Sequence, residues 1–303
     1  MSKTFLGCGS AALLTIAGTA FAQPPGVTME MINTTLPLEG APAAVPGPYE
    51  VTSGPAAPGL MAFRPTNLDA FPTRDTLPVL VWGNGGCAID STRWGDFLST
   101  IASHGFLVLG TAAQEGAERR QATADDLLAG IDWAFAENAR AGSPLNGKVA
   151  TDQVAAMGQS CGGFLSVSLG TDPRVDTIGV FNAGVQAPNP GAPAGRFPTT
   201  DALKDLHGPV LLINGHERDF MMEASASNYE AITHVPVFYG ARENAGHTAT
   251  VFHPGGGEYA NVAANWLRWT FKKDSDAAKM FVGDDCSLCT NPNWDTQSKG
   301  FGE

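Results

Sequence analysis

Short apolar runs alternate with helical patterns along most of the chain, and this alternation restricts the fold more than any other feature. Runs of four or five apolar or β-branched residues, bounded by Gly, Pro or polar turns, predict buried strands. Strands that alternate with helices pair in parallel and are covered by helices on both faces. The predicted fold class is therefore α/β, with a mostly parallel central sheet. The predicted strands are residues 60–63, 78–82, 106–109, 153–157, 177–181, 209–213 and 235–239, and the predicted helices are 92–103, 122–139, 161–169, 224–232 and 259–271.

The first 22 residues have the pattern of a secretory signal peptide. A positive start with Lys3 precedes an apolar stretch at 4–18 and a small-x-small pattern that ends at Ala22. That stretch is shorter than the roughly 18 to 20 residues that span a bilayer, which argues against a membrane anchor. Too little apolar chain precedes Cys8 for a lipoprotein. We therefore expect cleavage near Ala22 and a secreted or periplasmic protein without a membrane span.

Composition divides the rest of the chain into three parts. Residues 23–48 are rich in Pro, Ala and Gly and predict an extended lead-in. Residues 49–279 carry the alternating pattern and form the main predicted domain, and residues 280–303 form a tail with a C-x-x-C pattern at 286–289. An irregular insert at 186–196 falls where this architecture often builds the wall of a substrate cleft. It is too short to be a separate cap domain.

Charge and composition exclude some classes of protein. The chain has 18 basic and 30 acidic residues, a formal net charge of -12, so it repels nucleic-acid phosphates and anionic lipid headgroups at long range. We therefore expect no nucleic-acid partner. Hydrophobic residues make up 43% and charged residues 16%, which is typical of a globular protein. The sequence carries no signal for a particular oligomeric state.

A glycine-rich turn at 158–163 follows one predicted strand and begins the helix predicted at 161–169. Its sequence, Gly-Gln-Ser-Cys-Gly-Gly, places glycines two positions on either side of Ser160. A tight strand-to-helix turn needs these glycines because side chains there would collide, and it exposes the serine hydroxyl at the start of the helix. The pattern predicts a nucleophile elbow with Ser160 as the nucleophile. The alternative is an ordinary turn in which Ser160 only caps the helix.

A second glycine-rich loop, at 83–87, follows the strand predicted at 78–82. Such a loop can point backbone N–H groups at developing negative charge and so form an oxyanion hole. One donor is predicted to be the N–H of Cys161, directly after the serine, and the other the N–H of Asn84 or of Gly85. The alternative is a plain strand-to-helix turn.

Nucleophilic catalysis by a serine also needs a histidine base, which follows the acid in chains with this kind of elbow. Of the six histidines, His247 lies in an Ala-Gly-His sequence between the last predicted strand and the last predicted helix. It is the predicted base. His253, six residues later and before Pro254, is the alternative and fits a loop residue better.

The orienting acid should follow the strand predicted at 209–213. Asp219 and Glu217 both lie there, and we favour Asp219 because four residues separate it from Gly215, enough to clear the turn. A metal site built from these acids and nearby histidines is a further alternative, but the chain has no H-E-x-x-H or similar ligand spacing. We therefore predict no metal and no cofactor.

The strand, the Gly-Asn-Gly-Gly loop, the serine turn, the acid segment and the Ala-Gly-His sequence, in this order, resemble the α/β-hydrolase family. The resemblance covers roughly residues 49–273. Within the family, the chain is similar to the dienelactone-hydrolase-like branch and to the cutinase or poly(ethylene terephthalate) hydrolase-like branch. It implies Ser160 as nucleophile, His247 as base and Asp219 as acid. Dienelactone hydrolases proper use a cysteine, but a nucleophilic Cys161 would put Gln159 where the first glycine must be.

The resemblance implies a secreted serine hydrolase that cleaves carboxylic esters, of small molecules or of polymers, through an acyl-enzyme. An amidase or peptidase with the same three residues is an alternative, and so is a catalytically silent fold used for binding. Trp82 beside the oxyanion loop and Phe220 beside the acid are predicted to line the substrate cleft, although aromatic side chains at strand ends are also common in cores.

Four cysteines remain after signal cleavage, and they can form two disulfides in three different ways. Disulfides are expected because an exported chain meets an oxidising environment. Both oxyanion donors must reach the same oxygen atom. The chain at Cys161 must therefore lie close to the loop that carries Cys87. We therefore predict a Cys87–Cys161 disulfide that clamps the oxyanion loop to the elbow, and a local Cys286–Cys289 disulfide in the tail. The alternative is that Cys87 and Cys161 are buried free thiols.

Overall fold

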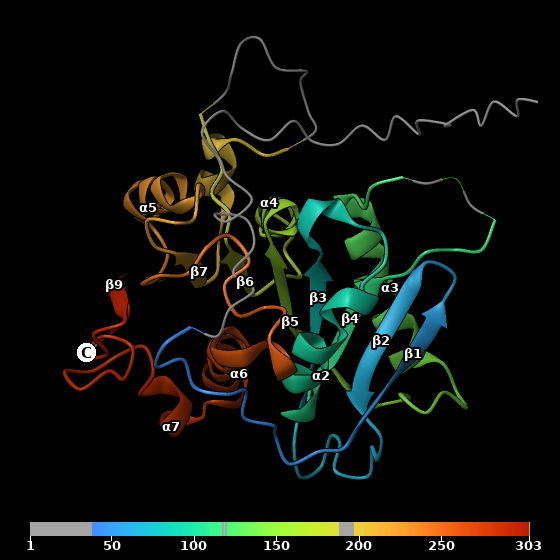
Figure 1. The fold of residues 1–303 in the computed structure, drawn as a ribbon. Coiled ribbons are helices and arrows are strands. Elements are labelled where there is room, and N and C mark those ends of the chain that lie inside the picture. Colours follow the sequence, from blue (N-terminus) through green and yellow to red (C-terminus); the bar gives the residue numbers. More distant parts are fainter. Residues whose placement is uncertain (1–37, 117, 119, 188–196, 303) are drawn as a thin grey trace, which may run out of the picture.

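A single twisted sheet forms the centre of the protein (Figure 1). The computed structural model describes residues 38–116, 118, 120–187 and 197–302. Within these residues the sheet has nine strands in the order β1-β2-β4-β3-β5-β6-β7-β8-β9. The six strands β3 to β8 run parallel, and the edge strands β1, β2 and β9 pair antiparallel. The predicted α/β class with a mostly parallel sheet is therefore confirmed.

The parallel strands follow the apolar runs of the sequence closely. Nearly all of their residues are buried, because helices cover both faces. The strands are β1 (Val51–Ala57), β2 (Leu60–Pro65), β3 (Leu77–Gly83), β4 (Leu107–Thr111), β5 (Val149–Gln159), β6 (Thr177–Phe181), β7 (Val210–Gly215), β8 (Val237–Arg242) and β9 (Trp294–Lys299).

Helices pack on the two faces of the sheet and separate the core into two apolar clusters. Helices α2 and α6 contribute to one cluster, and Figure 1 shows them together in front of the sheet. Helices α3, α4 and α5 contribute to the other. The helices are α2 (Gly95–Ser103), α3 (Ala124–Ala139), α4 (Cys161–Leu169), α5 (Met222–Ala231), α6 (Gly257–Lys272) and the short α7 (Ser275–Ala278).

The sequence did not predict the two edge strands β1 and β9. Strand β1 contains Gly54 and Pro55, which disfavour strands, and β9 has the polar sequence Trp-Asp-Thr-Gln-Ser-Lys. Both strands are only half-buried, so they carry no continuous apolar run. Part of the C-terminal tail is therefore the last strand of the sheet, paired with β8.

Three predictions made from the sequence fall wholly or mostly outside the described residues. They are the signal peptide at 1–22, the lead-in at 23–48, of which 23–37 is not described, and the irregular insert, of which 188–196 is not described. Within the described ranges, no helix has both the length and the apolar character needed to cross a membrane.

A buried ion pair fastens the end of β8 to α6. Arg242 Nε donates to Glu258 Oε2 at 2.8 Å, and the two side chains are 1% and 4% exposed. Trp294 at the start of β9 donates its indole N–H to the other oxygen of Glu258 at 2.7 Å, and Arg242 Nη2 donates to the Glu39 carbonyl at 2.7 Å. One carboxylate therefore holds strands β8 and β9 to helix α6.

Removing the charge of Glu258 should destabilise the fold. We expect Glu258→Gln to lower the free energy of unfolding by about 3 kcal/mol, because Arg242 would stay buried without its counter-ion. The exposed pair of Lys279 with Asp276 is the control, and Lys279→Ala should lower the free energy of unfolding far less. Urea unfolding of both variants measures the difference, and equal small losses would contradict this role of Glu258.

Candidate active site

Ser160 lies at a sharp turn between β5 and α4. Its backbone has φ 55° and ψ -119°, a conformation that residues other than glycine rarely adopt. Its N–H donates to the Phe181 carbonyl of β6 at 2.8 Å, and its own carbonyl accepts from Gly163 N–H at 2.8 Å. The strand, the turn and the helix are those expected of a nucleophile elbow.

Three glycines allow the chain around Ser160 to approach β3. A methyl group added to Gly162 would lie 1.9 Å from the Gly83 carbonyl oxygen, and one on Gly158 would lie 2.3 Å from the Gly162 oxygen. Neither position can hold a side chain without moving the backbone. Contact between the backbones of β3, β5 and the first turn of α4 therefore requires Gly83, Gly158 and Gly162.

The structure brings the three predicted catalytic residues into one hydrogen-bonded row. His247 Nδ1 lies 2.8 Å from Asp219 Oδ1, and His247 Nε2 lies 2.8 Å from Ser160 Oγ. A carboxylate can only accept, so the proton of the neutral ring lies on Nδ1 and Nε2 is free to accept from the serine hydroxyl. Residues 87 positions apart thus meet at the carboxyl edge of the sheet.

The Asp219 carboxylate is almost completely buried, with 3% of the residue exposed. Besides His247 it accepts hydrogen bonds from Asn182 Nδ2 at 2.8 Å, from Gly215 N–H at 3.1 Å and from Met221 N–H at 3.1 Å. A buried charge needs such donors to offset its lost hydration. The sequence did not predict Asn182 in this role; its position directly after a buried strand was the available signal.

The loop that carries His247 is held from two sides. Gln159, next to the serine, donates from Nε2 to the His247 carbonyl at 3.0 Å, and its side chain is buried. The Phe220 ring lies against the imidazole, with ring centroids 4.1 Å apart and planes 32° apart. Phe220 is half-buried beside the site where the sequence placed it. The positioning contact of Gln159 was not predicted.

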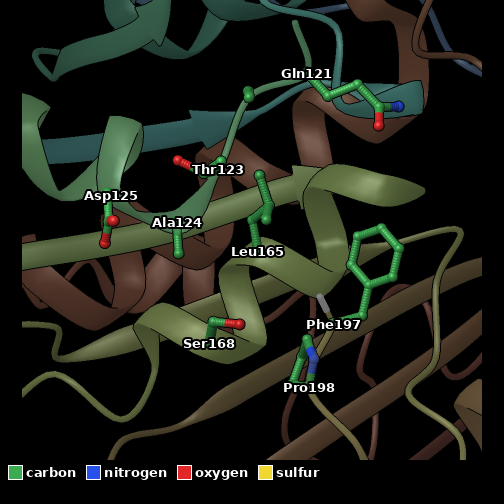
Figure 2. Close-up of a pocket in the computed structure, with 9 residues that line it drawn as sticks. Gln121, Thr123, Ala124, Asp125, Leu165, Ser168, Phe197 and Pro198 are labelled. Carbon is green, nitrogen blue, oxygen red and sulfur yellow. The ribbon is translucent and has the colours of Figure 1, made fainter. Parts of the chain in front are cut away.

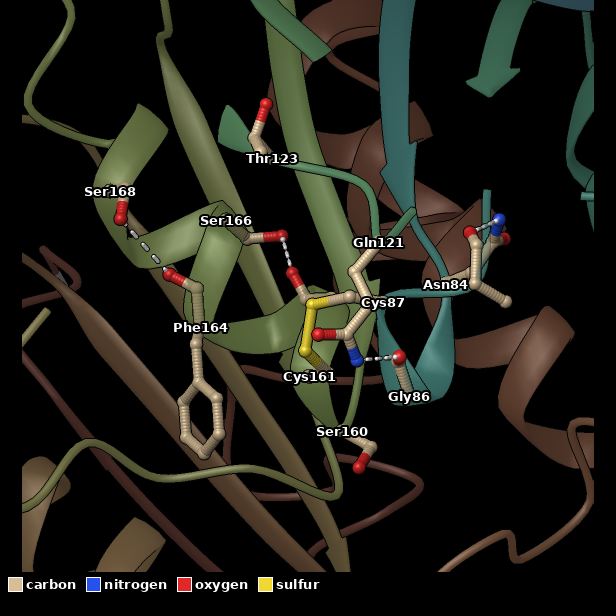
Figure 3. The surroundings of a disulfide bond; sticks show 12 residues. Asn84, Gly86, Cys87, Gln121, Thr123, Ser160, Cys161, Phe164, Ser166 and Ser168 are labelled. Carbon is tan, nitrogen blue, oxygen red and sulfur yellow. Dashed lines mark hydrogen bonds between the residues drawn. A yellow bond between two sulfur atoms is a disulfide. The ribbon is translucent and has the colours of Figure 1, made fainter. Parts of the chain in front are cut away.

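The glycine-rich loop after β3 lies beside the elbow and is joined to it by a disulfide. Cys87 and Cys161 form this bond, with Cα atoms 5.1 Å apart, and Gln121 Nε2 donates to the Gly86 carbonyl at 2.9 Å (Figure 3). The Asn84 side chain points away from solvent and donates to the Ala88 carbonyl at 2.8 Å. Its amide therefore shapes the loop.

The other cysteines form the second predicted pair. Cys286 and Cys289 are joined in the tail, with Cα atoms 5.1 Å apart. Cys286 is fully buried in the cluster formed with α2 and α6, so this local disulfide closes a turn that packs on the core.

Trp82 does not line a cleft, which corrects the prediction from sequence. The residue is 0% exposed, and its ring packs against Phe97 and Phe181 at centroid distances of 4.8 and 6.1 Å. Side chains alternate along a strand, so Trp82 and Leu80 face the α2 and α6 side of the sheet. The tryptophan belongs to the core.

The alternative acid and the alternative base lie elsewhere. The Glu217 side chain is 82% exposed and lies 3.9 Å from His216, while His253 precedes the 3-10 turn at Pro254–Gly256. Ligand atoms of His216, Glu217 and Glu243 lie within 4.8 Å of one another. Neither Asp219 nor His247 belongs to this group.

A pocket with a volume of about 640 Å³ opens beside the disulfide, between the start of α3 and the outer face of α4 (Figure 2). Gln121, which also donates to Gly86 in the glycine-rich loop after β3, lines the pocket, and Phe197 packs on Phe164 of α4 with centroids 5.2 Å apart. Its lining combines hydroxyl, carboxylate and apolar groups: Gln121, Ala122, Thr123, Ala124, Asp125, Leu165, Ser168, Phe197 and Pro198.

Tyr259 on α6 is a buried titratable group behind the acid. Complete burial, followed by the negative charge of Asp219, raises the pKa of its phenol well above the usual value. The phenol therefore stays protonated and can only donate or accept a hydrogen bond as a neutral group.

Comparison with known proteins identifies one family. A sequence model described as PET hydrolase-like matches residues 73–293, which include the loop after β3, the elbow, Asp219 and His247. No curated protein sequence matches the chain.

A methyl group at the elbow should disrupt this site. We expect Gly162→Ala to lower the free energy of unfolding by about 3 kcal/mol, because its Cβ would overlap the Gly83 carbonyl. Gly54→Ala in β1 is the control, since a methyl group there has no neighbour within 4 Å. Urea unfolding compares the two, and a Gly162→Ala protein as stable as the control would contradict the backbone contact.

Proposed function

Because this chain belongs to the PET hydrolase-like family of α/β-hydrolases, we propose that it is a secreted serine esterase that cleaves carboxylic esters through an acyl-enzyme. The observation that carries the proposal is the row from Ser160 Oγ through the His247 ring to Asp219, with both contacts at 2.8 Å. A serine hydroxyl is a weak nucleophile until a neighbouring base accepts its proton, and this row supplies that base.

In the acylation step His247 Nε2 accepts the proton of Ser160 Oγ while the oxygen attacks the ester carbonyl. The imidazolium that forms is stabilised by Asp219, which keeps the Nδ1 proton in place. The same Nε2 then donates the proton to the leaving alcohol. The acyl group stays on Ser160 until a water molecule, activated by His247 in the same way, releases the acid.

The tetrahedral intermediates need donors for their negative oxygen. The Cys161 N–H is in the first turn of α4, where backbone N–H groups lack intrahelical acceptors and the helix dipole favours negative charge. The N–H of Asn84 or of Gly85 is the proposed second donor. The Cys87–Cys161 disulfide, which joins the two loops, supports this proposal because it limits their separation.

We assign the substrate class from the family and from the surroundings of Ser160, His247 and Asp219. The proposed substrates are external esters of small molecules or of polymers, and the reaction uses neither metal nor cofactor. Phe220 provides apolar surface at the histidine, and the pocket that begins at Gln121 combines polar and apolar side chains. We propose that this surface contacts the portions of a larger ester that flank the scissile bond.

Two properties support export of the protein. The pattern at 1–22 is that of a signal peptide, and the two disulfides are of the kind that persists in oxidising compartments.

Substitution of the nucleophile or base should abolish ester hydrolysis. We expect Ser160→Ala and His247→Ala each to lower kcat for a p-nitrophenyl ester by a factor on the order of 10⁴. Circular dichroism shows whether each variant is folded. A folded Ser160→Ala protein with wild-type turnover would refute the function, and faster cleavage of anilides than of esters would assign an amidase.

The two candidate acids should respond differently to loss of charge. Asp219→Asn should lower kcat by a factor on the order of 10⁴, because an amide no longer holds His247 in the correct tautomer. Glu217→Gln is the matched control and should change kcat less than about twofold, because its exposed side chain lies beside His216 and makes no hydrogen bond to His247. A larger effect at Glu217 would reverse the assignment.

The Cys87–Cys161 disulfide should affect catalysis more than binding. Replacing both cysteines with alanine should lower kcat about tenfold or more and change KM less than about threefold, because loss of a whole oxyanion donor costs roughly 10² to 10³ in kcat. The Cys286→Ala/Cys289→Ala double variant is the control and should retain kcat. Equal kcat values in the two double variants would exclude the clamp.

A further inference from the structure

The side of the Asp219 carboxylate that faces away from His247 is occupied by Asn182. This residue directly follows β6, is 0% exposed, and donates from Nδ2 to Asp219 Oδ2 at 2.8 Å. Its backbone N–H donates to the Ile213 carbonyl of β7 at 2.7 Å. The amide is therefore fixed between two strand ends, with one side chain bond to the acid.

The Asn182 backbone adopts φ 49°, in the left-handed region. Asparagine tolerates this conformation better than other residues that have a side chain, apart from aspartate. An aspartate there would place a second carboxylate against Asp219. The backbone conformation at position 182 thus favours asparagine, and the neighbouring Asp219 carboxylate requires a hydrogen-bond donor.

An amide can present either its nitrogen or its oxygen, and only the nitrogen suits a carboxylate. Asn182 Oδ1 is buried, and within the described residues it has no hydrogen-bond partner. The bond from Nδ2 to Asp219 therefore fixes which end of the amide faces the acid.

We propose that Asn182 is a positioning residue for the reaction: it holds Asp219 in the plane of the His247 ring. This inference rests on the proposed function, since it assigns a role toward the proposed acid. The row of groups extends from Asn182 through Asp219 and His247 to Ser160. No atom of Asn182 touches the reacting bond, so its effect is on geometry.

One variant removes the amide from this row: Asn182→Gly deletes the side chain and tolerates φ 49°. The control is Asn214→Ala, because Asn214 is also 0% exposed and donates at 2.6 Å to Ser225 Oγ without touching the three catalytic candidates. Both variants lose a buried polar group, so stability alone cannot separate them.

Turnover of a p-nitrophenyl ester is the first readout. We expect Asn182→Gly to lower kcat by about 10- to 100-fold, because a small displacement of the acid misplaces the histidine, and to leave KM within about threefold. Asn214→Ala should leave kcat within about twofold. If Asn182→Gly keeps wild-type kcat, or loses no more than the control, the positioning role is wrong.

The ¹H NMR resonance of the His247 Nδ1 proton is the second readout and does not depend on turnover. It should shift or broaden in Asn182→Gly and stay in place in Asn214→Ala; an unchanged resonance in Asn182→Gly would overturn the proposal. A wild-type protein that cleaves no ester would refute the proposed function instead, while the NMR comparison would still test whether Asn182 orders the pair of Asp219 and His247.

Discussion

Close contact between the backbones of β3, β5 and the first turn of α4 determines where the serine lies. Gly83, Gly158 and Gly162 approach so closely that a Cβ on Gly162 would come within 1.9 Å of a carbonyl oxygen. Because helix α4 begins immediately against the sheet, Ser160 is forced into its left-handed conformation and its hydroxyl is presented at the carboxyl edge. The distance from Oγ to His247, and the position of the Cys161 N–H, both follow from this contact.

The second requirement is a buried carboxylate with hydrogen-bond donors around it. Asp219 is almost fully buried, and burial of an unpaired charge is costly. Its donors come from the loop after β6, the last residue of β7 and the loop after β8, so three strand ends hold one side chain. The hydrogen-bonded groups are thereby oriented before any substrate binds, which is how an enzyme avoids reorganisation during the reaction. Gln159 and the disulfide hold the flanking loops in the same way.

Much of this could be predicted from the sequence because the signals are local. The buried parallel strands are apolar runs, and the elbow needs glycines at fixed spacing, so β6 and α4 have the predicted bounds. Strands β1 and β9 were missed because a half-exposed edge strand needs no apolar run. Trp82 was misplaced because both faces of β3 are buried, and sequence does not reveal that its ring faces α2. Asn182 was missed because its role depends on Asp219, 37 residues away.

The proposed mechanism requires that Ser160, alone among the serines, is activated as a nucleophile. Treatment of the intact protein with a fluorophosphonate, followed by mass spectrometry of the whole chain and of its peptides, tests this most directly, because the reagent reacts with an activated serine and needs no knowledge of the natural ester. We expect one adduct per chain, located on the peptide that contains Ser160, and none in Asp219→Asn on the same timescale. Absence of an adduct in the folded wild-type protein, or an adduct on another serine, would contradict it.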